Sequence, residues 1–201
     1  FDSLENLFSM PKVRIFGNAV LSLWSKISSG YWSITDPTNG FTAIHKRALS
    51  RCDLSAVSKD YFFESDMLFH LYLARGKVLD VPMDAAYGDE TSGLVARRWV
   101  FPFLFRNVRN LVHRLVFTYL YRDITVHAVY LLISIMLLAF GFAFGISRWL
   151  VSSVEQSAAT SGTVMLAALP IIIAIQLGIA FLQRDLENVP RIPISCDGNV
   201  K

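Results

Sequence analysis

The sequence of 201 residues is poor in charge and in cysteine. Charged residues make up 17% of the chain, against about 25% in an ordinary soluble protein. The two cysteines, Cys52 and Cys196, form no Cys-x-x-Cys pair, which excludes a disulfide scaffold and leaves no sign of a cysteine metal site. Hydrophobic residues make up 53% of the chain, so intrinsic disorder is also excluded.

Charge is scarcest in the last third of the chain. Residues 1–126 contain fifteen Lys or Arg and twelve Asp or Glu, whereas residues 127–201 contain four of each class. Two long apolar runs fill this second part, Ala128–Ile146 and Gly162–Leu182. About 20 apolar residues in a helix cross the hydrocarbon core of a bilayer. We therefore predict two transmembrane helices, at about 128–146 and 162–182 within a membrane domain 127–183. The alternative is a pair of buried core helices, which so small a domain could hardly surround.

The basic residues around these runs predict their orientation. Six arginines lie between Arg97 and Arg122, ahead of the first run, and the link between the runs contains only Arg148. Arg184, Arg191 and Lys201 follow the second run. Because basic loops stay in the cytoplasm, we expect a multi-pass protein of the inner (plasma) membrane. Its globular part and both termini, including the tail 184–201, would then be cytoplasmic.

Residues 95–126 predict a basic amphipathic helix that begins after Pro102 and lies in the membrane interface. One face would carry the basic side chains of Arg106, Arg109, His113 and Arg114. The other would carry Phe105, Val108, Leu111, Val112, Leu115, Val116 and Tyr119. The basic face would attract either the phosphate of a specific lipid or anionic headgroups in general.

Residues 1–94 indicate a globular domain of the α/β class. Apolar periodicity predicts helices over Val13–Ile27, Lys46–Leu54 and Phe62–Leu73, and strands over Phe41–Ile44 and Lys77–Val81. Alternating helices and strands are typical of α/β folds. The strands are too few for a complete domain of this class.

Two acidic residues stand out in this part. Asp36 opens the turn Asp36–Gly40, and Asp66 lies in an otherwise apolar helix. Asp36 could be an ordinary Asx-turn acceptor, and Asp66 could be a helix-terminal or solvent-facing carboxylate. Both could also take part in chemistry.

Three motifs follow one another along the chain: Arg-x-x-Gly-Asn from Arg14, Asp-Pro-Thr-Asn-Gly-Phe from Asp36, and Phe-Glu-Ser-Asp-Met-Leu-Phe from Phe63. With the flanking sequence from Met10 to Leu94, they resemble the second half of a membrane-anchored family 2 glycosyltransferase. The similar enzymes are dolichol-phosphate mannose synthase and bacterial polyprenyl-phosphate glycosyltransferases. The predicted interfacial helix and two spans extend the resemblance to the end of the chain.

The resemblance implies a GT-A fold, a nucleotide-sugar donor, a divalent metal (Mg or Mn) and a polyprenyl-phosphate or other lipid-linked acceptor. In that family the nucleotide-binding strands and the metal-binding Asp-x-Asp precede these motifs. Residues before Arg14 contain no such motif. We therefore expect a C-terminal part of a longer enzyme, without a metal site of its own and inactive by itself.

The resemblance assigns roles to six positions. Asp66 matches the residue often called the catalytic carboxylate, and Asp36 and Gly40 match a turn at the acceptor side of the cleft. Arg14 falls where these enzymes place a basic residue near the acceptor phosphate. Arg97 and Arg98 resemble the Arg-Trp pair of processive synthases, although Val95 stands where those have Gln. The loop Tyr87–Gly93 lacks the Arg and Lys that many relatives use for phosphates.

An alternative function is a non-catalytic membrane scaffold with two spans that pair through Gly141-x-x-x-Gly145. This reading allows a homo-oligomer but leaves the three motifs unexplained. No charged side chain lies in either apolar run, so a transporter has little support. We expect the lipid bilayer as a partner, and no nucleic acid.

Overall fold

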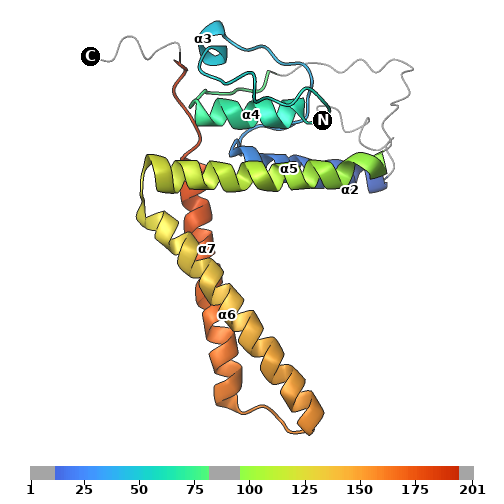
Figure 1. Cartoon of the computed structure of the whole chain (residues 1–201), viewed down its shortest axis with the longest axis vertical. Coiled ribbons are helices and arrows are strands. Elements are labelled where there is room, and N and C mark those ends of the chain that lie inside the picture. Colours follow the sequence, from blue (N-terminus) through green and yellow to red (C-terminus); the bar gives the residue numbers. More distant parts are fainter. Residues whose placement is uncertain (1–11, 82–95, 195–201) are drawn as a thin grey trace. The chain divides into compact units, whose positions relative to one another are not determined.

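The computed structural model describes residues 12–81 and 96–194. The chain divides into two compact units, one of residues 1–117 and 189–201 and the other of residues 118–188. Within the described ranges every regular element is a helix, and no strand or sheet is formed (Figure 1). The predicted α/β, GT-A-like fold is therefore wrong for this chain.

In the described part of the first unit there are four helices: α2 (Lys12–Ser29), α3 (Lys46–Leu49), α4 (Phe63–Leu73) and α5 (Ala96–Val116). The helices predicted over 13–27 and 62–73 are confirmed by α2 and α4, while α3 is shorter than predicted. The prediction that the amphipathic helix begins after Pro102 is wrong, because α5 begins at Ala96 and includes Pro102. A proline within a helix removes one backbone donor, and this helix continues past it.

The two predicted strands are the main source of the wrong fold class. Residues 41–44 and 77–81 are outside any regular element. Their β-branched and apolar residues favour an extended backbone, but a strand also needs a neighbouring strand to pair with. The described residues supply no such neighbour.

The core of the first unit lies between α4 and the segment that follows α2. Its buried apolar side chains are Tyr31, Ile34, Val57, Met67, Leu71 and Tyr72. The rings of Tyr31 and Tyr72 meet edge to face with 5.6 Å between centroids, an arrangement favoured by aromatic quadrupoles. This core fixes the end of α2 against α4, and with it the turn that begins at Asp36.

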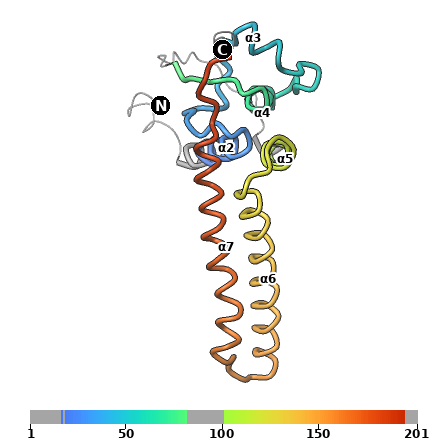
Figure 2. The backbone as a smooth tube through the Cα atoms, turned by 90° about the vertical axis from the view of Figure 1, so that its left-hand side faces the viewer, coloured from blue at the N-terminus to red at the C-terminus, as the bar shows by residue number. Residues whose placement is uncertain are grey.

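The second unit is a helical hairpin. A π-helix, η1 (Phe117–Arg122), begins at the boundary between the units, and α6 (Val126–Glu155) and α7 (Ser161–Glu187) follow it. Figure 2 shows α6 and α7 running side by side. Both are long and apolar enough to cross a membrane, and only 11% of the most apolar window of each is buried. Two apolar helices compatible with membrane spanning are therefore present where the two runs were predicted, and neither is buried as a core helix would be.

Small and polar side chains join the two long helices. Ser134 Oγ on α6 donates a 2.7 Å hydrogen bond to the carbonyl oxygen of Ala174 on α7. Gly141 lies so close to α7 that a Cβ atom there would be 2.6 Å from Cγ1 of Ile171. Close approach at small residues is the usual basis of helix packing in membranes.

A buried polar pair joins η1 to the end of α7. The Tyr119 hydroxyl donates a 2.9 Å hydrogen bond to Oδ1 of Asp185, and both side chains are almost fully buried. The rings of Tyr119 and Phe181 also meet, with 5.0 Å between centroids. The carboxylate thus has a donor inside the hairpin, as a buried acceptor requires.

Candidate functional site

The Asp36 motif forms the turn that its sequence predicts. Oδ1 of Asp36 accepts hydrogen bonds from the backbone N–H of Thr38 at 3.1 Å and from its hydroxyl at 2.8 Å. Oδ1 of Asn39 accepts a 3.0 Å hydrogen bond from the N–H of Phe41. The Asx-turn interpretation of Asp36 is confirmed. Its side chain is exposed, so the same carboxylate can also meet a ligand.

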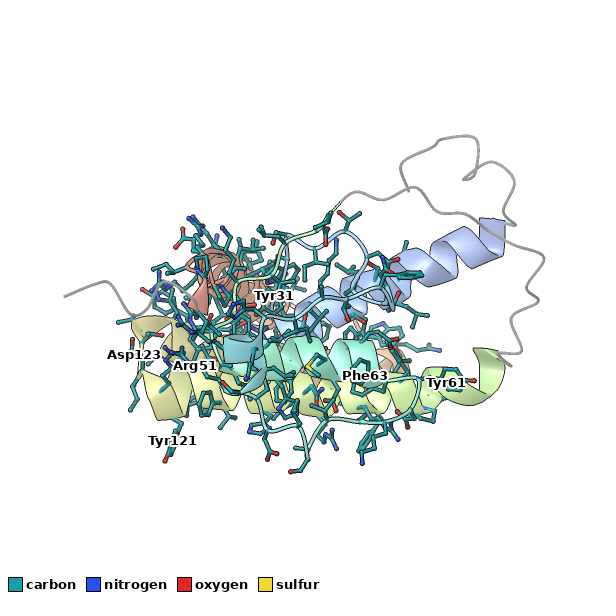
Figure 3. The ribbon with its side chains drawn as sticks, turned by 90° about the horizontal axis from the view of Figure 1, so that it is seen from above. Tyr31, Arg51, Tyr61, Phe63, Tyr121 and Asp123 are labelled. Carbon is teal, nitrogen blue, oxygen red and sulfur yellow. The ribbon has the colours of Figure 1, made fainter. Side chains whose placement is uncertain are left out.

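This turn lies against the start of α4, which carries the second motif. A Cβ atom on Gly40 would be 3.7 Å from Oε1 of Glu64. Phe63, labelled at the start of α4 in Figure 3, and Glu64 are also close to the residues after the turn, because both line one cavity with Thr42. Two motifs that are more than twenty residues apart in the sequence therefore meet in space.

The cavity where they meet has a volume of about 330 Å³. Its wall comes from the segment after the turn, from one face of α4, from the segment after α4 and from the chain near Ile194. The lining residues are Thr42, Ala43, Ile44, His45, Ala48, Phe63, Glu64, Met67, Leu68, Leu71, Gly76, Lys77, Val78, Leu79, Pro193 and Ile194. A mostly apolar cavity of this size with a few polar groups is typical of a small-molecule site.

Asp66 is buried, so its interpretation as a solvent-facing carboxylate is wrong. Its side chain is 1% exposed. Oδ2 accepts 2.8 Å hydrogen bonds from both the N–H and the hydroxyl of Ser58, and Oδ1 accepts a 2.8 Å hydrogen bond from Nδ2 of Asn110. The carboxylate is thus fully engaged inside the protein, where it fixes the loop before α4 and a side chain of α5.

A second carboxylate joins the segment just before α4 to α5. Asp60 accepts a hydrogen bond from the N–H of Phe62 at the start of α4 and forms a 2.6 Å ion pair with Arg106 of α5. The hydrogen bond from Arg106 holds the pKa of Asp60 below its usual range. Figure 1 shows α4 and α5 side by side, as these contacts require.

The polarity of α5 is the reverse of that of an ordinary surface helix. Three of its polar side chains are buried against the rest of the unit: Asn107, Asn110 and Arg114. Its outward face is mainly apolar, with exposed Phe101, Phe105, Val108, Val112 and Val116. Such a face suits the acyl boundary of a membrane. The sequence predicted the amphipathic character but not that polar side chains would face the protein.

The predicted basic face of α5 is only partly available to lipid phosphates. Arg114 is 1% exposed, and its guanidinium donates hydrogen bonds to the carbonyl oxygens of Ser28 at 3.2 Å and Ile27 at 3.0 Å. It also lies over the ring of Tyr72. A cation here satisfies the last carbonyls of α2. Arg109 and His113 remain exposed.

Gly30 makes this arrangement of Arg114 possible. It ends α2 with a φ of 82°, a conformation that glycine adopts without steric cost. A Cβ atom there would lie 2.7 Å from Cε2 of Tyr72 and 2.8 Å from Nη1 of Arg114.

Three of the predicted site residues cannot be placed in this geometry. Arg14 belongs to α2, and Arg97 and Arg98 belong to α5, but their side chains lie outside the described residues, as does the loop 87–93. The structure brings Gly40 close to Glu64, which lines the cavity, and holds Asp66 inside the protein. Glu64 was not singled out from the sequence, although its place in the Phe-Glu-Ser-Asp motif was a usable signal.

The described residues do not fit the divalent metal that the resemblance implies. No three His, Cys, Asp or Glu side chains among them are grouped closely enough to hold an ion. Comparison of the chain with protein families, with curated proteins and with solved structures finds no match.

Proposed function

We propose that this chain is the membrane-attached, acceptor-side part of a glycosyltransferase. The reaction transfers a sugar from a nucleotide-sugar donor to a polyprenyl-phosphate or other lipid-linked acceptor. We place it at the cytoplasmic face of the inner membrane. The motifs of the sequence support this class of reaction.

The meeting of two of these motifs is the observation that carries the proposal. The Asp36 turn and the start of α4 lie together, and Gly40 of the first motif approaches Glu64 of the second. A cavity large enough for a small ligand begins at this point. The second motif lines this cavity and the first lies beside it, as expected when both contact the same ligand.

A lipid-linked acceptor requires the site to be close to a bilayer. The motif helix α4 is bonded to α5 through Asp66–Asn110, and the segment just before α4 is bonded to α5 through Asp60–Arg106. The outer face of α5 presents apolar side chains that suit the membrane interface, and α6 and α7 are candidate spans. These features support a globular part held at the membrane surface.

The two acidic positions have different roles in this proposal. Asp36 is exposed at the turn and can contact the acceptor directly. Asp66 is buried and accepts three hydrogen bonds, which suits a positioning group better than a proton acceptor. A general base must reach the proton that it removes.

Sugar transfer by the complete protein, meaning the longer enzyme of which this chain is the proposed part, tests the proposal. The protein is purified with its membrane part, reconstituted with polyprenyl phosphate or a polyprenyl-linked sugar, and given labelled nucleotide sugars with Mg²⁺ or Mn²⁺. Label in the lipid extract supports the proposal. Its absence across the panel of donors and acceptors contradicts it.

Asp53 offers a matched control for Asp36. Oδ1 of Asp53 accepts hydrogen bonds from the N–H of Ser55 at 3.0 Å and from its hydroxyl, the same pattern that Asp36 makes with Thr38. Asn preserves an Asx turn but removes the charge. We expect Asp36→Asn to reduce transfer by roughly 10²-fold or more, and Asp53→Asn to leave it unchanged. Equal activity of both variants would remove Asp36 from the site.

Sidedness is tested separately by cysteine labelling. In a variant without Cys52 and Cys196, a cysteine at Ser157, between α6 and α7, should react only from outside the cell. A cysteine at Ser50 should react only from the cytoplasm. Both positions are exposed. Labelling of both from one side would contradict a two-span topology with cytoplasmic termini.

A further inference from the structure

The cavity beside the Asp36 turn presents a carboxylate that the described part of the chain does not use. Glu64 lines the cavity and is half-buried. Among the described residues it has no hydrogen-bond or ion-pair partner from a side chain, whereas Asp60 and Asp66 on either side of it are both engaged. A half-buried carboxylate without a partner in the protein can accept hydrogen bonds from water or from the hydroxyls of a ligand.

Two donors line the same cavity. Nδ1 of His45 accepts a 3.2 Å hydrogen bond from the N–H of Arg47, so the proton of the neutral ring is on Nε2, which can donate. Lys77 contributes an ammonium group from an exposed side chain at the rim. The titratable side chains of the cavity are therefore one acceptor-only carboxylate and two donors, and the hydroxyl of Thr42 can donate and accept.

This set of groups fits hydroxyls better than it fits a phosphate. A hydroxyl can donate to Glu64 while it accepts from His45 or Lys77. A phosphate has only acceptor oxygens at neutral pH and would meet the charge of Glu64 at close range. The remaining wall, with Met67, Leu68, Leu71, Val78, Leu79 and Ile194, suits an apolar group joined to the hydroxyl-bearing one.

We infer that the cavity binds a sugar that carries an apolar tail, with the sugar hydroxyls within hydrogen-bond reach of Glu64. This inference rests on the proposed function and deepens it, because it selects a sugar hydroxyl rather than a lipid phosphate as the acceptor group. It also assigns substrate contact to Glu64 rather than to the buried Asp66.

Two probes with the same tail separate the two acceptor chemistries. Octyl β-D-glucoside and octyl phosphate are added, below their micellar concentrations, to the complete protein in nanodiscs of zwitterionic lipid. The ¹³C-methyl NMR signal of Met67 reports on the cavity, which this residue lines, and Met67→Leu assigns it. Met136 and Met165, on the apolar spans, report partition of the probes into the bilayer.

We expect the glucoside to shift the Met67 signal in a saturable way, and octyl phosphate to bind at least tenfold more weakly. Glu64→Gln should weaken glucoside binding about tenfold or more, since a hydrogen bond to a charged group is lost. Glu64→Lys should reverse the preference toward octyl phosphate. The matched control is Glu155→Gln, at the exposed end of α6, which should bind both probes as the unaltered protein does.

Three results would overturn the inference: phosphate binding as tight as glucoside binding, glucoside binding unaffected by Glu64→Gln, or no response of Met67 to either probe. These results are independent of the transfer assay. Transfer without glucoside binding at Met67 would remove the inference and leave the proposed function. Glucoside binding without transfer would leave a sugar site in a protein that is not a glycosyltransferase.

Discussion

Nδ2 of Asn110 on α5 donates a 2.8 Å hydrogen bond to Oδ1 of Asp66 on α4, and both side chains are almost fully buried. This bond joins the motif helix directly to the helix whose other face carries exposed apolar side chains. The same region contains buried Ser25, Ser28, Ser65 and Asn107, with Ser28 donating to Asn107. The interface of α2, α4 and α5 is therefore polar, and its stability depends on complete hydrogen bonding.

Asn110→Asp is expected to be more damaging than Asn110→Ala. The aspartate places a second carboxylate beside Asp66, whereas the alanine only removes one donor. Loss of the donor should lower the free energy of unfolding of the first unit by about 1–3 kcal/mol. Adding Asp66→Asn to Asn110→Asp should restore most of the lost stability, because the bond forms again with donor and acceptor exchanged. Denaturant unfolding in nanodiscs measures the stability of each variant. A double variant as unstable as Asn110→Asp alone would contradict the hydrogen bond between residues 66 and 110.

Gly30→Ala should destabilise the end of α2, because the added Cβ meets Tyr72 and Arg114 at a residue with positive φ. We expect a loss of more than about 1 kcal/mol, the usual penalty of a left-handed non-glycine residue. Gly17→Ala is the matched control, because Gly17 lies within α2 with no atom within 4 Å of its added Cβ. That variant should be stabilised by about 0.5–1 kcal/mol through helix propensity. Equal effects of Gly30→Ala and Gly17→Ala on thermal unfolding would contradict the positive-φ geometry of Gly30 at the end of α2.

The parts of the fold that depend on composition and periodicity were predictable. Hydropathy located both long helices, the apolar pattern located α4, and Asp-Pro-Thr-Asn-Gly predicted its turn. The extended segments 41–44 and 77–81 were predicted as strands because local propensity indicates backbone shape, whereas pairing depends on a neighbour elsewhere in the chain.

The parts that depend on tertiary contacts were not predictable. Periodicity divides α5 into two faces, but it cannot say which face meets the protein, so the inward position of Arg114 was missed. Asp66 and Glu64 lie two residues apart on one helix and therefore point in different directions. Only the packing of α5 shows that Asp66 is buried and that Glu64 is the residue at the cavity.

The stability of the first unit should fall as the pH drops below about 6.5. Burial lowers the pKa of His70 from its ordinary value, and the nearby carboxylates of Asp66 and Asp53 oppose this shift only in part. The unfolded chain therefore binds a proton more readily than the folded chain, and stability rises with pH across this window. The free energy of unfolding should change by less than about 1.4 kcal/mol per pH unit, which is the limit for the binding of one proton. His70→Gln should flatten unfolding curves measured between pH 5 and 7.5, and an unchanged slope would rule out His70 as the cause.

The hairpin of α6 and α7 allows a test of whether the motif Gly141-x-x-x-Gly145 packs against a helix of the same chain or against a helix of a second copy. A Cβ on Gly141 would lie 2.6 Å from Cγ1 of Ile171 and 3.1 Å from the carbonyl oxygen of Ala167, whereas one on Gly145 would meet Cβ of Ala167 at an ordinary 3.4 Å. We therefore expect Gly141→Ala to destabilise the hairpin by about 1–3 kcal/mol through overpacking, and Gly145→Ala to have little effect.

A contact between copies predicts a different pattern, because both glycines of such a motif would lie at the shared interface. Spin labels on α6 and α7 report the separation of the helices, and sedimentation in detergent reports the oligomeric state. Gly162→Ala, at the start of α7 with only Thr160 Oγ1 at 4.0 Å from its added Cβ, is the control. If only Gly141→Ala separates α6 from α7, and the oligomeric state is unchanged, the motif packs against α7 of the same chain. Reduced association in both Gly141→Ala and Gly145→Ala, with an unchanged hairpin, would instead support the scaffold.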